Sequence, residues 1–213
     1  MYNIKMLVAA ITASMTLMTP VNAMANCQQD RTELPITIER VEIPIELSSP
    51  VGASVEPMED DLSIEEARAD LNFYMEIDKP CGLTKEAFVS IMENLPYDYV
   101  GFYERNAEFI WEMEQKYNVN AIFICGIIAI ESEWGQYDAC RNNYSGLTGS
   151  GSNGYAVFET EEEGIEETFL YVINNCISYD FTTIPSIAYP YTRVKVTTWD
   201  SQVYSAMQMI LFY

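Results

Sequence analysis

The sequence is 213 residues long and contains 32 acidic and 11 basic residues, which give a formal net charge of −21. Nucleic acids and anionic membrane surfaces repel such an acidic chain, so we expect neither as a partner. The chain contains no histidine, which excludes His-ligated zinc hydrolysis, Ser-His-Asp triads and Cys-His peptidase chemistry. Among secreted hydrolases, the main class that survives this exclusion cleaves glycosidic bonds with carboxylates.

Residues 1–25 have the organisation of a secretory signal. Lys5 is their one charged residue, an apolar run covers residues 6–18, and Ala23-Met24-Ala25 matches a small-x-small cleavage site. We therefore predict that the protein is secreted or held at the cell surface, without a membrane attachment after processing. Cys27 leaves lipidation open as a minor alternative.

The rest of the chain divides into a spacer and a compact domain. The composition of residues 26–82 indicates an acidic, extended spacer with a possible short helix over 62–70. Residues 83–213 form the domain, which we expect to be a monomer. Two prolines predict irregular structure over 178–197. Helical periodicity and capping residues predict helices over 85–94, 104–117, 120–135 and 160–175, and a last one after residue 197 or 198.

Five cysteines, at positions 27, 81, 125, 140 and 176, remain after processing. Export permits disulfides, but an odd number leaves at least one thiol free or bridged to another molecule. We predict a Cys140–Cys176 pair, and we expect Cys125, which lies in an apolar run, to act as a small buried hydrophobic residue. No CxxC motif or ligand-spaced cluster indicates a metal site, so we expect neither a metal nor another cofactor.

The stretch from Asn120 to Gly135 places a carboxylate at the end of an apolar helix. Ten almost wholly apolar residues precede Glu131, a run too short to cross a bilayer, which needs about 20 residues. Two isoleucines lie one turn before Glu131 and Trp134 lies one turn after it. Apolar neighbours and the negative end of the helix dipole both disfavour the charged form of the carboxyl group. Glu131 is therefore either a general acid or a surface glutamate at a frayed helix end.

A glycine-rich segment follows this helix. Residues 142–158 contain too many glycines for a long helix, and Asn153-Gly154 between short apolar pieces predicts a β-hairpin. The predicted fold class is mainly α (α+β), a helical domain with a small β-hairpin lobe directly after the helix that carries Glu131.

These features, in this order, resemble the N-acetylglucosaminidase domain of bacterial autolysins, glycoside hydrolase family 73, over about residues 83–213. Residues 114–135 are similar to the family's Asn-Ala helix that ends in Glu-Ser-Gly-Trp-Gly, residues 142–147 to its Asn-Asn-Leu-Phe-Gly-Ile motif, and residues 155–165 to its tyrosine-containing hairpin. The resemblance implies a lysozyme-like fold, peptidoglycan as substrate, no metal, and Glu131 as the catalytic acid. Glu133 stands where the family has glycine.

Further site residues come from the same motifs. Glu159 is the candidate base, because Glu163 is explained by a capping box with Thr160. An inverting enzyme needs its base about 6.5–9.5 Å from the acid and a retaining one a nucleophile about 5 Å away, while a third route uses the acetamido group of the substrate. Tyr189 is the candidate for the family's C-terminal tyrosine. The candidates for substrate binding are Trp134, which can equally pack the helix end, with Asn143, Tyr155 and Phe158.

The predicted function is a secreted endo-β-N-acetylglucosaminidase that cleaves the bond after N-acetylglucosamine in peptidoglycan glycan strands, with Glu131 as general acid. Two alternatives stay open. One is a lytic transglycosylase or muramidase of the same fold, and the other is a non-catalytic module that binds cell-wall glycan. The reducing or anhydro ends of the products distinguish the two kinds of enzyme.

Overall fold

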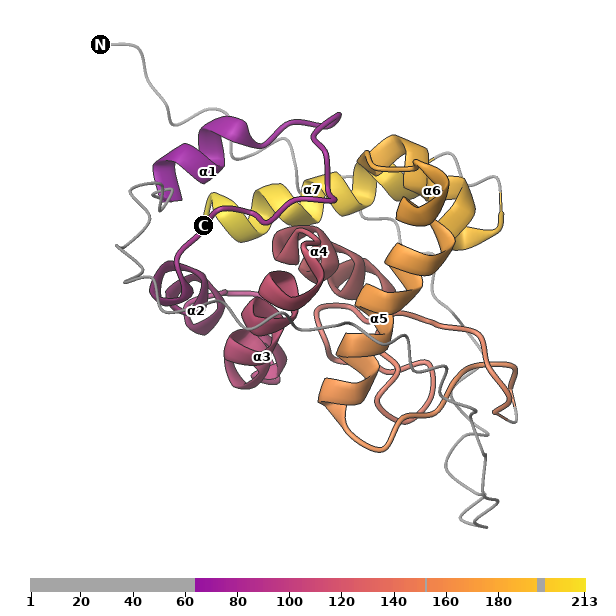
Figure 1. Cartoon of the computed structure of the whole chain (residues 1–213). Helices are drawn as coiled ribbons and strands as arrows, with labels where there is room; N and C mark the ends of the chain where they lie inside the picture. The colour runs from indigo at the N-terminus through magenta and orange to yellow at the C-terminus, as the bar shows by residue number, and fades with distance from the viewer. Residues whose placement is uncertain (1–63, 152, 195–197) are drawn as a thin grey trace, which may run out of the picture.

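Helices form nearly all of the regular structure. A computed structural model describes residues 64–151, 153–194 and 198–213; the predicted signal and most of the predicted spacer lie outside these residues. Helix α4 lies at the centre, with the other long helices around it (Figure 1). The elements are α1 (Ile64–Asp70), α2 (Lys85–Glu93), α3 (Phe102–Tyr117), α4 (Ala121–Glu131), α5 (Glu161–Asn175), the 3-10 helix η3 (Ile177–Tyr179), α6 (Ile184–Thr192) and α7 (Trp199–Leu211).

Helix α4 is the centre of the hydrophobic core. Nine of its 11 residues are buried. Asn120 caps the helix, because its side-chain oxygen accepts a hydrogen bond of 2.9 Å from the N–H of Phe123. Gly126 permits a close approach of α7: a Cβ at this position would lie 3.0 Å from Cγ of Met207 and 3.1 Å from the carbonyl oxygen of Val203. The tight contact fixes α7 against the helix that ends in the candidate acid.

Buried or partly buried carboxylates hold the two ends of α3. Asp98 accepts two hydrogen bonds of 2.7 Å from N–H groups in the first turn of α3. Near the other end, the fully buried Glu114 accepts hydrogen bonds of 2.7 Å from the backbone N–H groups of Cys81 and Ala121. Glu114 therefore ties α3 to the start of α4 and to the segment that precedes α2.

The folded unit begins upstream of the boundary near residue 83 that the sequence predicts. Ala67 of α1 and Ile77 belong to the same hydrophobic core as α4. The N–H of Ile77 donates to the carbonyl of Thr182 at 2.8 Å, and its own carbonyl accepts from the N–H of Asn120 at 2.9 Å. Residues 64–82 therefore contribute to the compact domain.

Helix α6 forms in the segment for which the sequence predicts irregular structure, so this prediction is wrong. Pro185 lies in the first turn, where a missing N–H leaves no hydrogen bond unmade. Thr183 and Ser186 form a capping box at the start of the helix. Pro190 lies close to the other end, two residues before Thr192. The two prolines thus occupy the beginning and the end of one short helix.

The predicted β-hairpin lobe is also wrong. Between α4 and α5, the described residues contain one isolated antiparallel bridge, between Thr148 and Tyr155, in place of two paired strands. The buried side-chain amide of Asn143 donates to the carbonyls of Leu147 at 2.8 Å and Ala156 at 3.0 Å. The Leu147 carbonyl still accepts the cross-strand bond from the N–H of Ala156 at 2.8 Å, but the Leu147 N–H donates to Oδ1 of Asn143. The Asn143 side chain therefore replaces the second bond that this pair would exchange in a ladder, and the glycines nearby weaken strand pairing. The mainly helical class is confirmed, and the segment is an irregular loop.

The predicted Cys140–Cys176 disulfide is wrong. Cys176 is a free thiol in the hydrophobic core, where burial raises its pKa to about 11, whereas Cys140 is disulfide-bonded. Cys125 is also free, and it is fully buried in α4.

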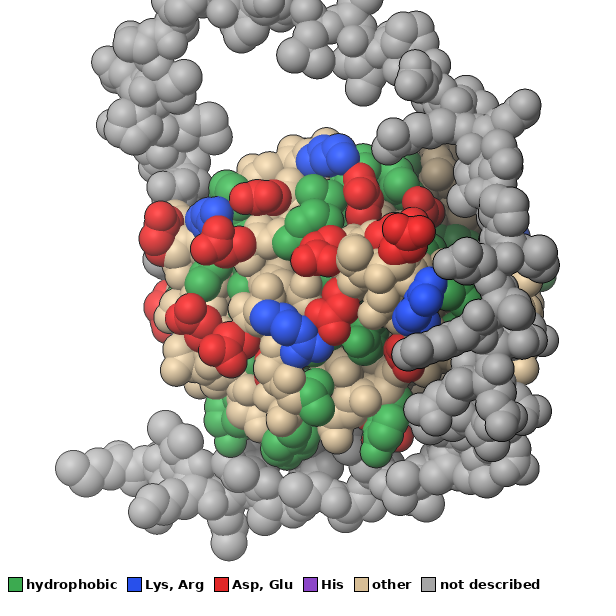
Figure 2. Space-filling model, turned by 90° about the horizontal axis from the view of Figure 1, so that it is seen from below, with side chains coloured by type: hydrophobic (Ala, Val, Ile, Leu, Met, Phe, Trp, Pro, Cys, Tyr) green, Lys and Arg blue, Asp and Glu red, His purple; other side chains and the backbone are tan. Residues whose placement is uncertain are grey.

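Acidic side chains are spread over the surface. Figure 2 shows Asp and Glu scattered over one face, with Lys and Arg among them. Some of the cations join helices through ion pairs, as Lys116 of α3 does with Glu166 of α5 at 2.7 Å. Within the described part of the chain, no helix has both the length and the apolar character that crossing a membrane requires.

Candidate active site

Glu131 is the last residue of α4, where its side chain leaves the buried helix and is exposed. Its Oε1 atom accepts a hydrogen bond of 2.8 Å from Nε1 of Trp199. The protein atoms around the carboxyl group raise its pKa by disfavouring the charged form, and the indole donor opposes this shift by lowering the pKa. Water thus reaches a carboxyl group whose pKa is raised, which is the combination that a general acid needs.

Three further segments converge on this carboxyl group. Trp199, at the start of α7, stacks on Tyr191 of α6 with ring centroids 5.0 Å apart and an interplanar angle of 25°. The Tyr191 hydroxyl donates to the backbone oxygen of Ser145 at 3.0 Å. The next residue, Gly146, faces the acid, because a Cβ there would lie 3.5 Å from Oε2 of Glu131. Residues from α4, the following loop, α6 and α7 therefore surround one side chain.

Buried polar groups hold the loop that carries Gly146. Asn143 is fully buried, and its Oδ1 accepts from the N–H of Leu147 at 2.9 Å in addition to the two bonds that its amide donates. The hydroxyls of Ser145 and Thr168 are hydrogen-bonded to each other. Gly146 itself has a φ of 66°, the left-handed conformation that glycine adopts without strain. Asn143, a predicted substrate-binding residue, thus lies in the scaffold of this loop.

An ion-pair network joins the same loop to α3 and α5. Nε and Nη2 of Arg105 each donate a hydrogen bond of 2.7 Å to the Glu161 carboxylate, and the side-chain amide of Asn106 donates another at 2.8 Å. The Tyr144 hydroxyl also donates to Glu161, at 3.0 Å. Arg105 lowers the pKa of Glu161, while burial is the main cause that raises the pKa of Tyr144 to about 12. Glu161 is therefore held ionised by its neighbours and serves to fix the loop.

Among the described residues, no hydrogen bond joins the side chains of the other predicted site residues to Glu131. Trp134 stacks on Tyr97, with ring centroids 4.8 Å apart, and so packs the end of α4. Tyr189 is 65% exposed and Glu159 is exposed, and no hydrogen bond among the described residues joins either of them to Glu131. Of the other two candidates for substrate binding, Phe158 is buried, and Tyr155 is half-buried beside its single β-bridge.

The sequence offers Tyr189-Pro-Tyr191 leading to Trp199 as the C-terminal tyrosine motif, and choosing Tyr189 from it missed Tyr191 and Trp199 as neighbours of the acid. Tyr191 lies two positions after Tyr189, and in a helix that spacing places the two rings on different faces. Trp199 has the apolar spacing of the last helix, which predicts a core residue, and it is 5% exposed. The one available signal was this run of aromatic residues before and at the start of the last predicted helix, and the run does not identify their partner.

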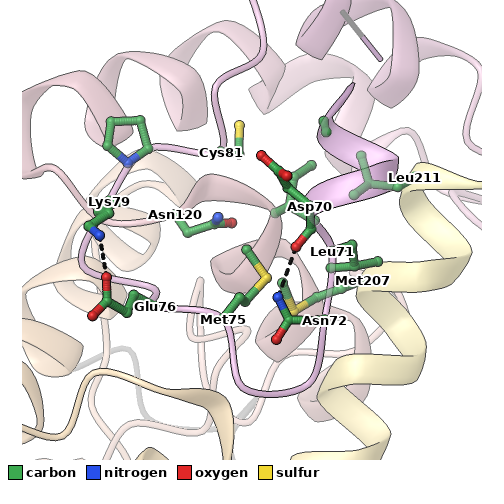
Figure 3. A pocket seen from close by; sticks show the side chains of 13 residues that line it. Asp70, Leu71, Asn72, Met75, Glu76, Lys79, Cys81, Asn120, Met207 and Leu211 are labelled. Carbon is green, nitrogen blue, oxygen red and sulfur yellow. Dashed lines mark hydrogen bonds and ion pairs between the residues drawn. The ribbon is translucent and has the colours of Figure 1, made fainter. Parts of the chain in front are cut away.

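A cavity of about 310 Å³ lies elsewhere, where the segment after α1 meets α4 and α7. Figure 3 shows the Lys79–Glu76 ion pair and the hydrogen bond from Asn72 to the backbone of Asp70 at its edge. Glu131 does not line this cavity, and the candidate chemistry is therefore independent of it. In the described ranges, no group of three or more Cys, Asp or Glu side chains is arranged to hold a metal ion.

Solved structures of autolysin E from S. aureus share this architecture. The complex with the muropeptide NAM-L-Ala-D-iGlu matches with a TM-score of 0.54 and 13% identity, over 69% of this chain and 75% of that one. A catalytic mutant with glutamate replaced by alanine, in complex with the disaccharide NAG-NAM, matches with a TM-score of 0.53 and 13% identity, over 69% and 76%. The chain has a glucosaminidase-like fold. The resemblance indicated by the sequence is thus confirmed for the fold, while no family model and no curated protein matches the sequence.

Proposed function

We propose that this protein is a peptidoglycan hydrolase, an endo-β-N-acetylglucosaminidase whose general acid is Glu131. The observation that carries the proposal is an exposed carboxyl group with a raised pKa at the end of a buried helix. The fold supports the substrate class, because autolysin E has been solved with a muropeptide and with the disaccharide NAG-NAM. The catalytic mutant of autolysin E in the disaccharide complex has an alanine in place of a glutamate.

In the proposed reaction, protonated Glu131 donates its proton to the glycosidic oxygen as the bond from N-acetylglucosamine to the next sugar breaks. The pKa of Glu131 is shifted by burial and by the Trp199 hydrogen bond, and neither cause is a second charge. Glu161 is committed to Arg105. This arrangement supports attack by the acetamido group of the substrate, with Glu159 as the competing candidate for a base.

The proposed site of action is outside the cell. Peptidoglycan lies beyond the membrane, and residues 1–25 have the composition of a secretory signal. With a net charge of −21, the chain gains no electrostatic attraction to an anionic wall, so recognition of the glycan rests on hydrogen bonds and aromatic contacts.

The test is muropeptide analysis of peptidoglycan digested by the wild type and by Glu131→Gln. We expect reducing N-acetylglucosamine ends from the wild type, and at least about a 10²-fold lower rate from the variant, which keeps the shape of the side chain but has no proton to give. Glu133→Gln is the matched control, because it removes a charge from an exposed neighbour and should leave the rate unchanged.

Other products would contradict the proposal. Anhydromuramic ends would assign the chain to the lytic transglycosylases. Equal activity of the wild type and Glu131→Gln would show that Glu131 is not the general acid. The variant Glu159→Gln then decides whether the acetamido group of the substrate or Glu159 acts together with the acid. An unchanged rate assigns the attack to the acetamido group, whereas a loss comparable to that of Glu131→Gln assigns the base to Glu159.

A further inference from the structure

The hydrogen bond between Trp199 and Glu131 gives the candidate acid a fixed orientation. We propose that Trp199, held in place by Tyr191, is a positioning residue that directs the proton of Glu131 onto Oε2, the oxygen that faces Gly146. This inference rests on the proposed function, since it names the atom from which the proton would be delivered to the glycan.

The argument begins with the chemistry of the indole group. Nε1 of Trp199 can donate a hydrogen bond but has no lone pair with which to accept one. Because it donates to Oε1 of Glu131 at 2.8 Å, that oxygen must act as the acceptor in both protonation states. A proton on the carboxyl group is therefore placed on Oε2.

The surroundings of Oε2 leave that proton accessible. Gly146 has no side chain, and a Cβ built there would lie 3.5 Å from Oε2, which is close enough for a larger side chain to cover the oxygen. The carboxyl group as a whole belongs to an exposed residue. Oε1 thus faces the buried indole, and Oε2 faces the backbone of a loop that offers no side chain in its way.

A closed chain of contacts fixes the indole. Trp199 is 5% exposed and stacks on Tyr191 at 5.0 Å. Tyr191 donates its hydroxyl proton to the carbonyl of Ser145 at 3.0 Å, and Ser145 precedes Gly146. The contacts run from Glu131 through Trp199, Tyr191 and Ser145 back to the glycine that faces Glu131. Neither the ring nor the loop can shift without breaking one of them.

Among the described residues, no charged side chain shifts the pKa of the Glu131 carboxyl group, which burial and the Trp199 indole control. Tyr191 is the titratable side chain from α6 that faces it, and burial raises the pKa of this phenol well above its ordinary value, so the phenol is neutral when the acid titrates. The group from α7 is the uncharged indole, and the loop presents a glycine. Removal of the indole N–H should therefore act directly on Glu131.

The experiment compares the wild type with Trp199→Phe, which keeps an aromatic ring for Tyr191 but removes the donor. The pKa of Glu131 is measured by NMR on protein with ¹³C-labelled glutamate, with Glu131→Gln to assign the signal. A hydrogen bond to a carboxylate favours the charged form, so we expect its loss to raise the pKa by about one unit. The alkaline limb of the kcat/KM profile should move upward by the same amount, and kcat should fall about tenfold with little change in KM.

The matched control is Trp111→Phe. Nε1 of Trp111 also donates one hydrogen bond from a partly buried position, to the carbonyl of Leu83 at 3.2 Å. This variant loses the same kind of donor without touching Glu131, so it should leave the Glu131 titration and the pH profile as they are. If Trp199→Phe does not fold, β-(3-benzothienyl)alanine at position 199 replaces the N–H by sulfur and keeps both rings.

An unchanged Glu131 pKa in the position-199 variants would overturn the proposal, and so would an equal shift in Trp111→Phe. The NMR titration does not depend on activity. If Glu131→Gln cleaved peptidoglycan as fast as the wild type, the proposed function would fail, while the titration would still show whether Trp199 controls this carboxyl group.

Discussion

Glu114 and Glu131 are two glutamates whose pKa is raised, and they differ in how their oxygens are satisfied. Glu114 is fully buried, and its oxygens accept hydrogen bonds from two backbone N–H groups, from the Cys81 thiol and from Gln115. Glu131 is exposed, and within the part of the chain that the structure describes it has one donor, the indole of Trp199. Burial raises the pKa of both. A fully satisfied carboxyl group serves to hold the fold, whereas one that keeps an oxygen without a donor among the described residues is available for proton transfer.

Glu131 should make the protein less stable as the pH rises. A carboxyl group whose folded pKa lies above its ordinary value of 4.5 binds its proton more tightly in the native state. Its stabilising contribution is therefore complete below about pH 4.5 and is lost as the pH rises through the folded pKa. The neutral amide of Glu131→Gln does not titrate, so this variant should keep its stability over the same range.

Urea unfolding of both proteins at pH 4 and pH 7 measures this difference. We expect the stability of Glu131→Gln relative to the wild type to be higher at pH 7 than at pH 4, by no more than about 1 kcal/mol because water screens an exposed side chain. A difference between the two proteins that is the same at both pH values would contradict the raised pKa. Glu133→Gln serves again as the control for a change in net charge.

At the scale of the elements, the α4–α7 contact determines where Trp199 meets Glu131. Gly126 allows this contact, since a Cβ there already lies 3.0 Å from Met207 and 3.1 Å from Val203. Gly126→Val adds two more carbon atoms against backbone and should force the helices apart, at a cost of about 1–3 kcal/mol. Thermal unfolding measures the loss, and the Glu131 titration shows whether Trp199 has moved with α7.

Ser205→Val is the matched control for this prediction. Ser205 lies on the exposed side of α7. A valine at this position is a similar β-branched side chain that does not contact α4. An unfolding midpoint of Gly126→Val equal to that of Ser205→Val would show that α4 and α7 are not packed as closely as described.

The elements also show how far the sequence determines the fold. The apolar run of α4 predicts a buried helix with Glu131 near its end and with a raised pKa, because both features depend on neighbours within one or two turns; the helix itself ends at Glu131, four residues before the predicted end. Asn153-Gly154 predicts a hairpin by equally local reasoning, but the side chain of Asn143 bonds the Leu147 N–H and the Ala156 carbonyl, which a ladder would join to each other. The Trp199–Glu131 contact joins residues 68 positions apart. No local pattern specifies such a contact, because it depends on the packing of α7 against α4.

At the scale of the whole molecule, residues 64–82 complete the core and hold the start of α4. Ile77 is fully buried, and its carbonyl bonds the N–H of Asn120, the capping residue of α4. Cys81 supplies one of the two backbone N–H groups that bind Glu114, and Ala121 supplies the other. The helix that carries the candidate acid is therefore anchored at its far end by a segment outside the predicted domain.

A chain that begins at Leu83 should consequently be much less stable than one that begins at Ser63. The shorter chain exposes the surface that Ile77 covers, which contributes about 1.5–3 kcal/mol. It also leaves the buried N–H of Asn120 and one side of Glu114 unpaired, at about 1–3 kcal/mol each. The expected loss of about 4 kcal/mol or more is a large part of the stability of an ordinary domain.

Urea unfolding of the two chains measures this loss. Ile77→Ala in the longer chain is the single-residue comparison, with an expected loss of about 2–5 kcal/mol. Equal unfolding midpoints for the two chains would show that the compact domain is complete from Leu83, and that residues 64–82 rest on it without supporting α4.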